Sequence, residues 1–395
     1  MKALQFNGNG TEYFKIWIVN ILLTIVTLGI YYPWAKVRSR RYFYGNTELD
    51  NANFEYHATG KQLFVSYIIA MVIFAIYVGV GQVFPMISGI LAVLFFFIFP
   101  WIIWRSLKFN FRMSSYRNVR FGFNGALGRS YAVFMGYPIA VIFAFVILIF
   151  IGITIGGGIE SVSSGMGALL VIPMFILMFL AYPAFFAMMN KLSQNYVING
   201  AHFGQGQFSA DLEFKPFFII LLKAMGLSIL LSILAFIAVG LLAYLIVGAD
   251  QIMTLGAQMQ AMEQGAQPNA LFFIVIFSVY AFFIAVGMYV LAYIKAKNRA
   301  YVFSNTTLDN TISFESTLQT GRFFSISLTN FILLIFTLGL AYPWAAVRLY
   351  RYSIESIEVE AKEGFDGYMS KAGSENALGE ELGDAFDIDV GGIAF

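Results

Sequence analysis

The chain has 395 residues, of which 59% are hydrophobic and only 12% are charged, and its formal net charge is +2. Soluble domains usually carry about a quarter charged residues, so part of the solvent of this chain must be lipid. The absence of cysteine excludes disulfides and thiolate-ligated metals, and the small net charge gives no case for nucleic acid as a partner.

Eight apolar stretches follow one another along the chain. Each is about long enough to cross a bilayer core of about 30 Å as a helix of about 20 residues. They cover residues 14–35, 63–83, 85–104, 131–154, 168–190, 216–247, 270–294 and 323–347. Membrane strands would be about ten residues long with alternating polarity, whereas these stretches are continuous. The sequence therefore predicts an all-α polytopic membrane protein.

Lysine and arginine are distributed unevenly between these stretches. Segments 36–61, 105–129, 191–215 and 295–322 contain 5, 6, 2 and 4 of them, whereas the connections near 84, 155–167 and 248–269 contain none. The positive-inside rule predicts that the basic loops are cytoplasmic. Three helical hairpins follow from this assignment, over residues 63–104, 131–190 and 216–294.

The first apolar stretch recurs near the other end of the chain. "TLGIYYPWAKVRSRRY" begins at Thr27 and "TLGLAYPWAAVRLYRY" begins at Thr337, and 16 of the 29 positions from 14 to 42 are identical at this spacing. Weaker copies of an aromatic start and a basic exit predict five degenerate repeat units in a membrane domain over 1–360. Their predicted bounds are 6–53, 54–120, 121–207, 208–313 and 314–360, and an acidic, flexible tail is expected over 361–395.

The two outer units hold one apolar stretch each, which leaves two interpretations open. If both ends of such a unit are cytoplasmic, about 23 residues are too few for two crossings, and a broken, re-entrant pair of half-helices is required. Thr27-Leu28-Gly29 or Tyr32-Pro33 would supply the break. The alternative is a single straight crossing, which places both termini outside and Arg348 and Arg351 on the wrong side.

Short segments between the units have the composition of β-hairpins. Residues 42–58 and 301–317 both place aromatic and β-branched residues on either side of an Asn/Asp turn cluster. We expect small cytoplasmic β-hairpin elements here, which pair across units into a small sheet under the membrane part.

Three motifs together resemble one known family. They are the Tyr-Pro-Trp-Ala-Lys-Val-Arg exit at 32–38, the Asn-Thr-x-Leu-Asp turn at 46–50 and 305–309, and the "GEELGDAFDIDVG" segment at 379–391. The combination resembles the YjgN family of bacterial inner-membrane proteins, a family of unknown function. The resemblance implies the plasma membrane and carries no substrate or reaction. Because Ala346 replaces Lys36 in the second copy, Lys36 is not essential to the geometry that the copies share.

A candidate substrate path is formed by residues that are unusual inside apolar segments. Lys223 is the one charge well inside a stretch, and Asn20 and Asn330 occupy equal places in the two copies. The breaks resemble the paired interrupted segments of transporters and add Gly29, Pro33, Gly339 and Pro343. Each signal has a structural alternative: a lysine that snorkels to the headgroups, helix–helix hydrogen bonds, and kinks at an interface.

Basic and aromatic residues at the exits form a second candidate site, for anionic phospholipid headgroups. The residues are Trp34, Arg38, Arg41, Trp101, Arg105, Trp344, Arg348 and Arg351. An interfacial aromatic belt and topology-setting charge explain the same residues without specific binding.

These observations leave two functional hypotheses. The leading one is a transporter or channel-like permease for a small solute, which predicts a polar cavity near mid-membrane lined by Asn20, Asn330 or Lys223. The other is a non-transporting lipid-binding or scaffold protein with a solid apolar core. His57 and His202 stand apart, with no acid arranged around them and no catalytic or metal-binding constellation. We therefore expect no enzyme activity, no cofactor and no metal, and the lipid bilayer as the partner.

Overall fold

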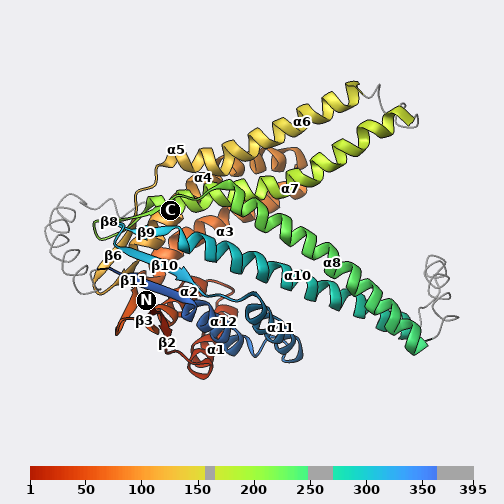
Figure 1. Ribbon diagram of the computed structural model, residues 1–395. Coiled ribbons are helices and arrows are strands. Elements are labelled where there is room, and N and C mark those ends of the chain that lie inside the picture. The colour runs from red at the N-terminus through yellow and green to blue at the C-terminus, as the bar shows by residue number, and fades with distance from the viewer. Residues whose placement is uncertain (156–164, 248–269, 363–395) are drawn as a thin grey trace.

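The strands of the protein gather at one end of the molecule, and the helices extend from them as hairpins (Figure 1). The computed structural model describes residues 1–155, 165–247 and 270–362. In this part of the chain the elements follow one order five times: strand, helical hairpin, strand, with α5, η1 and α6 together as the first arm of the third hairpin.

The bounds of the elements show this order. The first two units are β1 (Lys2–Ala3), β2 (Gln5–Phe6), α1 (Gly10–Val26), α2 (Tyr32–Gly45) and β3 (Thr47–Leu49), then β4 (Ala52–Tyr56), α3 (Gly60–Val83), α4 (Pro85–Arg112) and β5 (Ser114–Tyr116). The third is β6 (Val119–Phe123), α5 (Leu127–Tyr131), the π-helical turn η1 (Ala132–Gly136), α6 (Tyr137–Ile155), α7 (Gly165–Gly200) and β7 (Ala201–Phe203). The last two are β8 (Gly206–Ala210), α8 (Phe214–Val247), α10 (Ala270–Ser304) and β9 (Thr306–Leu308), then β10 (Ile312–Ser316), α11 (Thr320–Phe336), α12 (Tyr342–Glu355) and β11 (Ile357–Ala361).

The strands form one antiparallel sheet that the N-terminus closes. Its order is β1-β11-β10-β9-β8-β7-β6-β5-β4-β3-β2. β1 and β2 are consecutive parts of one short strand, of which β1 pairs with β11 and β2 pairs with β3. Leu4 lies between them and donates its N–H to the carbonyl of Ile357 at 3.0 Å. The closure leaves no long free edge for pairing with another chain.

The sheet corrects the all-α prediction. The expected hairpins at 42–58 and 301–317 are present as β3–β4 and β9–β10, but they belong to a sheet of 11 strands. The physical reason is that an isolated hairpin of three- to five-residue strands is marginal, whereas pairing with neighbours on both sides supports each of them. The predicted unit boundaries at 53/54, 120/121, 207/208 and 313/314 stay a prediction, and the predicted tail lies outside the described residues from 363 on.

The inside of the closed sheet is filled with apolar side chains from all five units. The buried members are Leu4, Leu49, Tyr116, Val119, Phe203, Leu308, Ile312 and Val359, and Phe54, Phe121, Phe208 and Phe314 pack against them. A small barrel filled in this way is a packed core and not a pore.

The helices form a ring in which each unit touches the next. α2 packs against α3, α4 against α5, α7 against α8, α10 against α11, and α12 against α1. Five described helices are long and apolar enough to cross a membrane: Gly60–Val83, Pro85–Arg112, Leu127–Ile151, Phe214–Leu241 and Phe273–Ser304. At most 11% of the residues in their apolar windows are buried inside the protein, so lipid must cover these surfaces.

The two outer stretches, 14–35 and 323–347, are not straight crossing helices. α1 ends at Val26 and α2 begins at Tyr32, and between them Leu28 and Gly29 have φ values of 50° and 92°. The second copy turns in the same way, with φ of 50° at Leu338 and 86° at Gly339. Each pair of helices folds back to the sheet, and both pairs are shorter than the other hairpins (Figure 1).

Candidate functional site

The structure brings functional side chains together at the joints between units, where the last helix of one unit meets the first helix of the next. At four joints a side chain of the last helix donates a hydrogen bond to the carbonyl two residues beyond a strand. These bonds are Arg41 Nη2 to Ala58 O (2.7 Å), Trp104 Nε1 to Gly125 O (2.8 Å), Asn195 Nδ2 to Leu212 O (3.4 Å) and Arg351 Nη2 to Gly8 O (2.6 Å). At the remaining joint, the Lys295 ammonium lies 4.7 Å from the ring centroid of Phe323. Arg41 and Arg351 therefore connect units.

Two tryptophans fill the space that glycine leaves at these joints. A Cβ on Gly60 would lie 2.2 Å from Cδ1 of Trp34, and a Cβ on Gly10 would lie 2.3 Å from Cδ1 of Trp344. The indole rings thus lie directly on the first turns of α3 and α1. The aromatic-belt prediction did not include this contact between units, because each glycine belongs to a different helix from its tryptophan and no local sequence pattern links the two.

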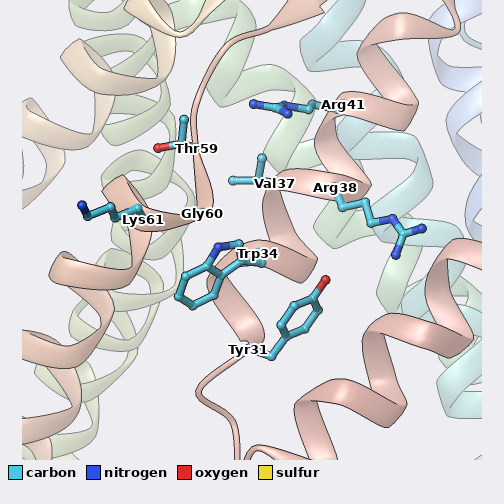
Figure 2. Close-up of a pocket in the computed structure, with 8 residues that line it drawn as sticks. All are labelled: Tyr31, Trp34, Val37, Arg38, Arg41, Thr59, Gly60 and Lys61. Atoms are coloured by element: carbon cyan, nitrogen blue, oxygen red, sulfur yellow. The ribbon is translucent and has the colours of Figure 1, made fainter.

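A pocket of about 440 Å³ opens at the joint between the first and second units. Its lining consists of Tyr31, Trp34, Val37, Arg38, Arg41, Thr59, Gly60 and Lys61. Figure 2 shows the Trp34 indole between Gly60 and the Tyr31 ring, with Arg38 and Arg41 on successive turns of α2. The Tyr31 and Trp34 rings are stacked, with centroids 6.1 Å apart and planes inclined by 14°. The lining thus contains three cations and no carboxylate.

The beginning of α3 adds to the positive potential of this pocket. Thr59 caps the helix: its Oγ1 accepts from the N–H of Gln62 at 3.3 Å, and Gln62 Oε1 accepts from the N–H of Thr59 at 3.0 Å. A helix N-terminus carries the positive end of the helix dipole. The dipole and the three side-chain charges therefore have the same sign.

Arg38 and Arg348 occupy equal positions in the two copies but have different surroundings. Arg348 Nη1 donates to Thr329 Oγ1 at 2.8 Å and to Asn330 Oδ1 at 3.5 Å. Val19 stands at the position of Thr329 in the first copy, and Arg38 has no hydrogen-bond partner among the described residues. Arg38 is therefore available to a ligand, and Arg348 is engaged within its own unit.

The asparagines of the predicted substrate path lie inside the short hairpins. Asn20 and Asn330 are 5% and 6% exposed. Asn20 Nδ2 donates to Ala35 O at 3.3 Å, and Asn330 Nδ2 donates to Ala345 O at 2.9 Å. Each asparagine thus ties the two helices of its own hairpin together, and neither lines the pocket at Trp34.

The other members of the two predicted sets are dispersed. Gly29 and Gly339 form the turns of the short hairpins, and Pro33 and Pro343 are buried in the first turns of α2 and α12. Lys223 is exposed on α8, and neither described pocket includes it. Trp101 and Arg105 are half-buried on α4, away from the pocket at Trp34.

One polar cluster was missed by the sequence analysis. His57 Nε2 lies 2.7 Å from Ser115 Oγ and 3.4 Å from Glu55 Oε2, so the expectation that no acid stands near His57 is wrong. Glu55 and His57 are two residues apart on β4 and therefore share a face, which is the signal that was available. The same nitrogen faces both oxygens and Ser115 is 1% exposed, an arrangement that does not prepare a nucleophile.

Two groups of the sheet have shifted pKa values. Lys2 and Arg117 lie against the carboxylate of Asp50 and hold its pKa below the ordinary value. Burial lowers the pKa of His202, whose ring lies on Gly122 of the neighbouring strand. Asp50 lies in the turn between β3 and β4 and His202 lies on β7, and neither is at a joint. Among the described residues there is no group of three His, Cys, Asp or Glu that could hold a metal.

Comparison with known proteins gives one family and several relatives. The family model described as "Bacterial protein of unknown function (DUF898)" matches residues 1–385. The "Inner membrane protein YjgN" of Salmonella typhimurium strain LT2 is 29% identical over 364 residues, which are 91% of this chain and 88% of the relative. The protein of the same name from Escherichia coli O157:H7 is 28% identical, over 86% of this chain and 84% of its own length. That of Escherichia coli K12 is 38% identical over 31% of each chain. No solved structure matches.

Proposed function

The chain belongs to the DUF898 family and is an integral inner membrane protein related to YjgN, and from this premise we propose that it binds anionic lipid headgroups at the joint between its first and second units. The observation that supports this most is the pocket at the first joint, which combines three cations with two interfacial aromatic rings. Guanidinium groups bind phosphate through paired, charge-assisted hydrogen bonds. Tryptophan and tyrosine prefer the level of the headgroups.

The permease hypothesis receives less support. It needs polar side chains around a shared space in the membrane, but Asn20 and Asn330 each donate to a carbonyl inside their own hairpin. Lys223 is exposed on α8, where snorkelling to the headgroups accounts for it. The closed sheet below the helices is filled with side chains. We therefore propose a non-transporting, lipid-binding membrane protein without a catalytic role.

Binding of anionic lipid is tested by comparing two lipids of similar chain composition. The protein is reconstituted into nanodiscs with mixtures of phosphatidylglycerol and phosphatidylcholine, and the lipid retained after extraction is measured by native mass spectrometry. Each cation near an anionic surface contributes about 1 kcal/mol. We expect Arg38→Gln with Lys61→Gln to lower the retained phosphatidylglycerol by about tenfold or more.

Arg348→Gln is the matched control, because it removes the same charge from the equal position of the other copy. It should leave the retained phosphatidylglycerol within about twofold of the wild type. Equal retention of the two lipids by the wild type, or no loss in the Arg38/Lys61 variant, would refute the proposal.

We also propose that the sheet and the basic joints face the cytoplasm. The chain has no cysteine, so single cysteines report their own side of the membrane. Asn53→Cys lies on an exposed position of β4, and Phe84→Cys lies between α3 and α4 at the other end of that hairpin. A membrane-impermeant thiol reagent should label residue 84 in intact cells and residue 53 only after the cells are opened. The reverse pattern would invert the orientation.

A further inference from the structure

The tips of the two short hairpins carry a leucine in a strained conformation. Leu28 and Leu338 both have φ of 50°, in the left-handed region that costs an ordinary residue about 1–2 kcal/mol. Glycine or asparagine adopts this conformation more readily. Both leucines are also far from the protein interior, with side chains 89% and 93% exposed. The side chains of the two leucines are therefore left open to whatever surrounds the protein.

The backbone around these tips satisfies its own hydrogen bonds. In the first hairpin the Oγ1 of Thr27 accepts from the N–H of Tyr31 at 3.0 Å, and the N–H of Gly29 donates to Thr24 O at 2.7 Å. Every N–H from residue 27 to 32 has an acceptor within the hairpin, and so has every N–H from residue 337 to 342. A turn in water has no need for this, but a turn in hydrocarbon does, because each unpaired group there costs several kcal/mol.

The short hairpins are too short to cross the bilayer. Between Lys15 and the tip at Leu28 lie only about 13 residues, or roughly 20 Å of helix at 1.5 Å per residue. The hydrocarbon core is about 30 Å thick. By contrast, α3 has 24 residues, about 36 Å by the same rise. The tip of a short hairpin that starts at the headgroups of one side therefore lies inside the hydrocarbon.

The two short hairpins also lie next to each other. α1 packs against α12. At this contact the Phe14 ring lies 5.0 Å from the Trp344 ring, and the Trp17 ring lies 6.0 Å from the Tyr342 ring. Of these four residues, Trp344 belongs to the set predicted at the headgroup level. The first and fifth units thus form one continuous sector of the helix ring that is shorter than the rest (Figure 1).

We infer that these two hairpins insert side by side into the leaflet next to the sheet and end among its acyl chains, with Leu28 and Leu338 as the anchors of the tips. In this sector the opposite leaflet then contains lipid and no part of these two hairpins, while the hairpins of the other units cross both leaflets. The partner of this surface is one leaflet of the bilayer. This inference is independent of headgroup binding at the pocket.

Spin labels measure the depth of the tips directly. Single cysteines at Leu28, Leu338 and, as the control, Phe84 are introduced into the cysteine-free chain and labelled after reconstitution into vesicles. Oxygen is concentrated in hydrocarbon, and a polar nickel chelate is concentrated in water. We expect high oxygen and low nickel accessibility at 28 and 338, and high nickel accessibility at 84.

Two results would overturn the inference. Nickel accessibility at residue 28 equal to that at residue 84 would place the tip in water. Low accessibility to both reagents, together with disulfide formation between two copies of the Leu28→Cys chain, would show that a second copy covers the tip.

A pair of substitutions gives a second readout that does not depend on a label. Leu28→Gly and Leu28→Asn both relieve the backbone strain. In hydrocarbon the asparagine amide lacks partners, so we expect the Asn variant to unfold at a lower temperature in vesicles than the Gly variant. Equal unfolding temperatures would contradict burial of the tip in acyl chains.

Discussion

The first and fifth units share 16 of 29 positions, yet their joints offer different groups to a ligand. In the fifth unit Arg348 is bound to Thr329 and Asn330. In the first unit the equal arginine, Arg38, lines an open pocket. The identical positions build the same hairpin twice, whereas the chemistry of the joint depends on neighbours that the repeat does not conserve.

The difference can be followed to three pairs of residues. Val19 replaces Thr329 and so leaves Arg38 without a hydroxyl acceptor. Tyr31 stands where the fifth unit has Ala341, and Lys61 stands where the joint between the fifth and first units has Thr11. Compared with the joint between the fifth and first units, the first joint thus gains the cation Lys61 and the aromatic ring of Tyr31. In addition, its Arg38 is not held by a hydroxyl group. Four sets of variants test this difference between the two joints, with expected effects that decrease in the order given.

The largest effect is expected at a feature that the two joints share. Gly60→Ala and Gly10→Ala place a methyl group within 2.3 Å of an indole ring, and such overpacking costs about 1–3 kcal/mol. Gly321→Ala is the matched control, because nothing lies within 4 Å of its Cβ position. Denaturant unfolding in detergent should show a lower free energy of unfolding for the variants at residues 60 and 10 and an unchanged one for the variant at 321. A loss at 321 of the same size would show that the effect is not due to the indole contact.

Substituting the buried asparagines should affect the stability of the two units differently. The side chain of Asn330 makes two hydrogen bonds, whereas that of Asn20 makes one. The Oδ1 atom of Asn20 is buried without a partner. We expect Asn330→Ala to lower the free energy of unfolding by about 1–2 kcal/mol and Asn20→Ala by less than about 1 kcal/mol. The same denaturation assay measures both. If Asn20→Ala is the more harmful change, the asparagine of the first unit has a role beyond tying its hairpin.

Supplying the missing hydroxyl should turn the first joint into one like the fifth. Val19→Thr places an acceptor where Thr329 holds Arg348 at 2.8 Å, and Arg38 should then be drawn out of the pocket. Losing one cation worth about 1 kcal/mol corresponds to about fivefold less retained phosphatidylglycerol. Val19→Ala changes the packing without adding a hydroxyl, and it should leave retention unchanged. Equal losses in the two variants would disprove the role of the hydroxyl.

The apolar helices and the break at Thr27–Gly29 could be predicted because they depend on local sequence. The turn at Thr27–Gly29 has a helix-breaking glycine in the sequence. The closed sheet could not be predicted, because strands of two to five residues gain their stability from partners in other units. The sequence also does not show that Arg41 reaches Ala58 while Arg38 stays free, since both arginines lie in one motif and their partners come from outside it.

The smallest effect is expected from the stacked ring of the first joint. Tyr31→Ala removes the ring that lies on Trp34 and gives the first joint the residue of the fifth, Ala341. Aromatic pairs contribute about 0.5–1.5 kcal/mol. Tyr31 acts on the headgroup only indirectly, by holding the Trp34 ring in place, so only part of this energy affects lipid binding. We therefore expect retention of phosphatidylglycerol to fall by about twofold. The reverse change, Ala341→Tyr, should give no gain, because Arg348 remains bound to Thr329 and Asn330. A gain there would mean that the aromatic pair, and not the free arginine, distinguishes the two joints.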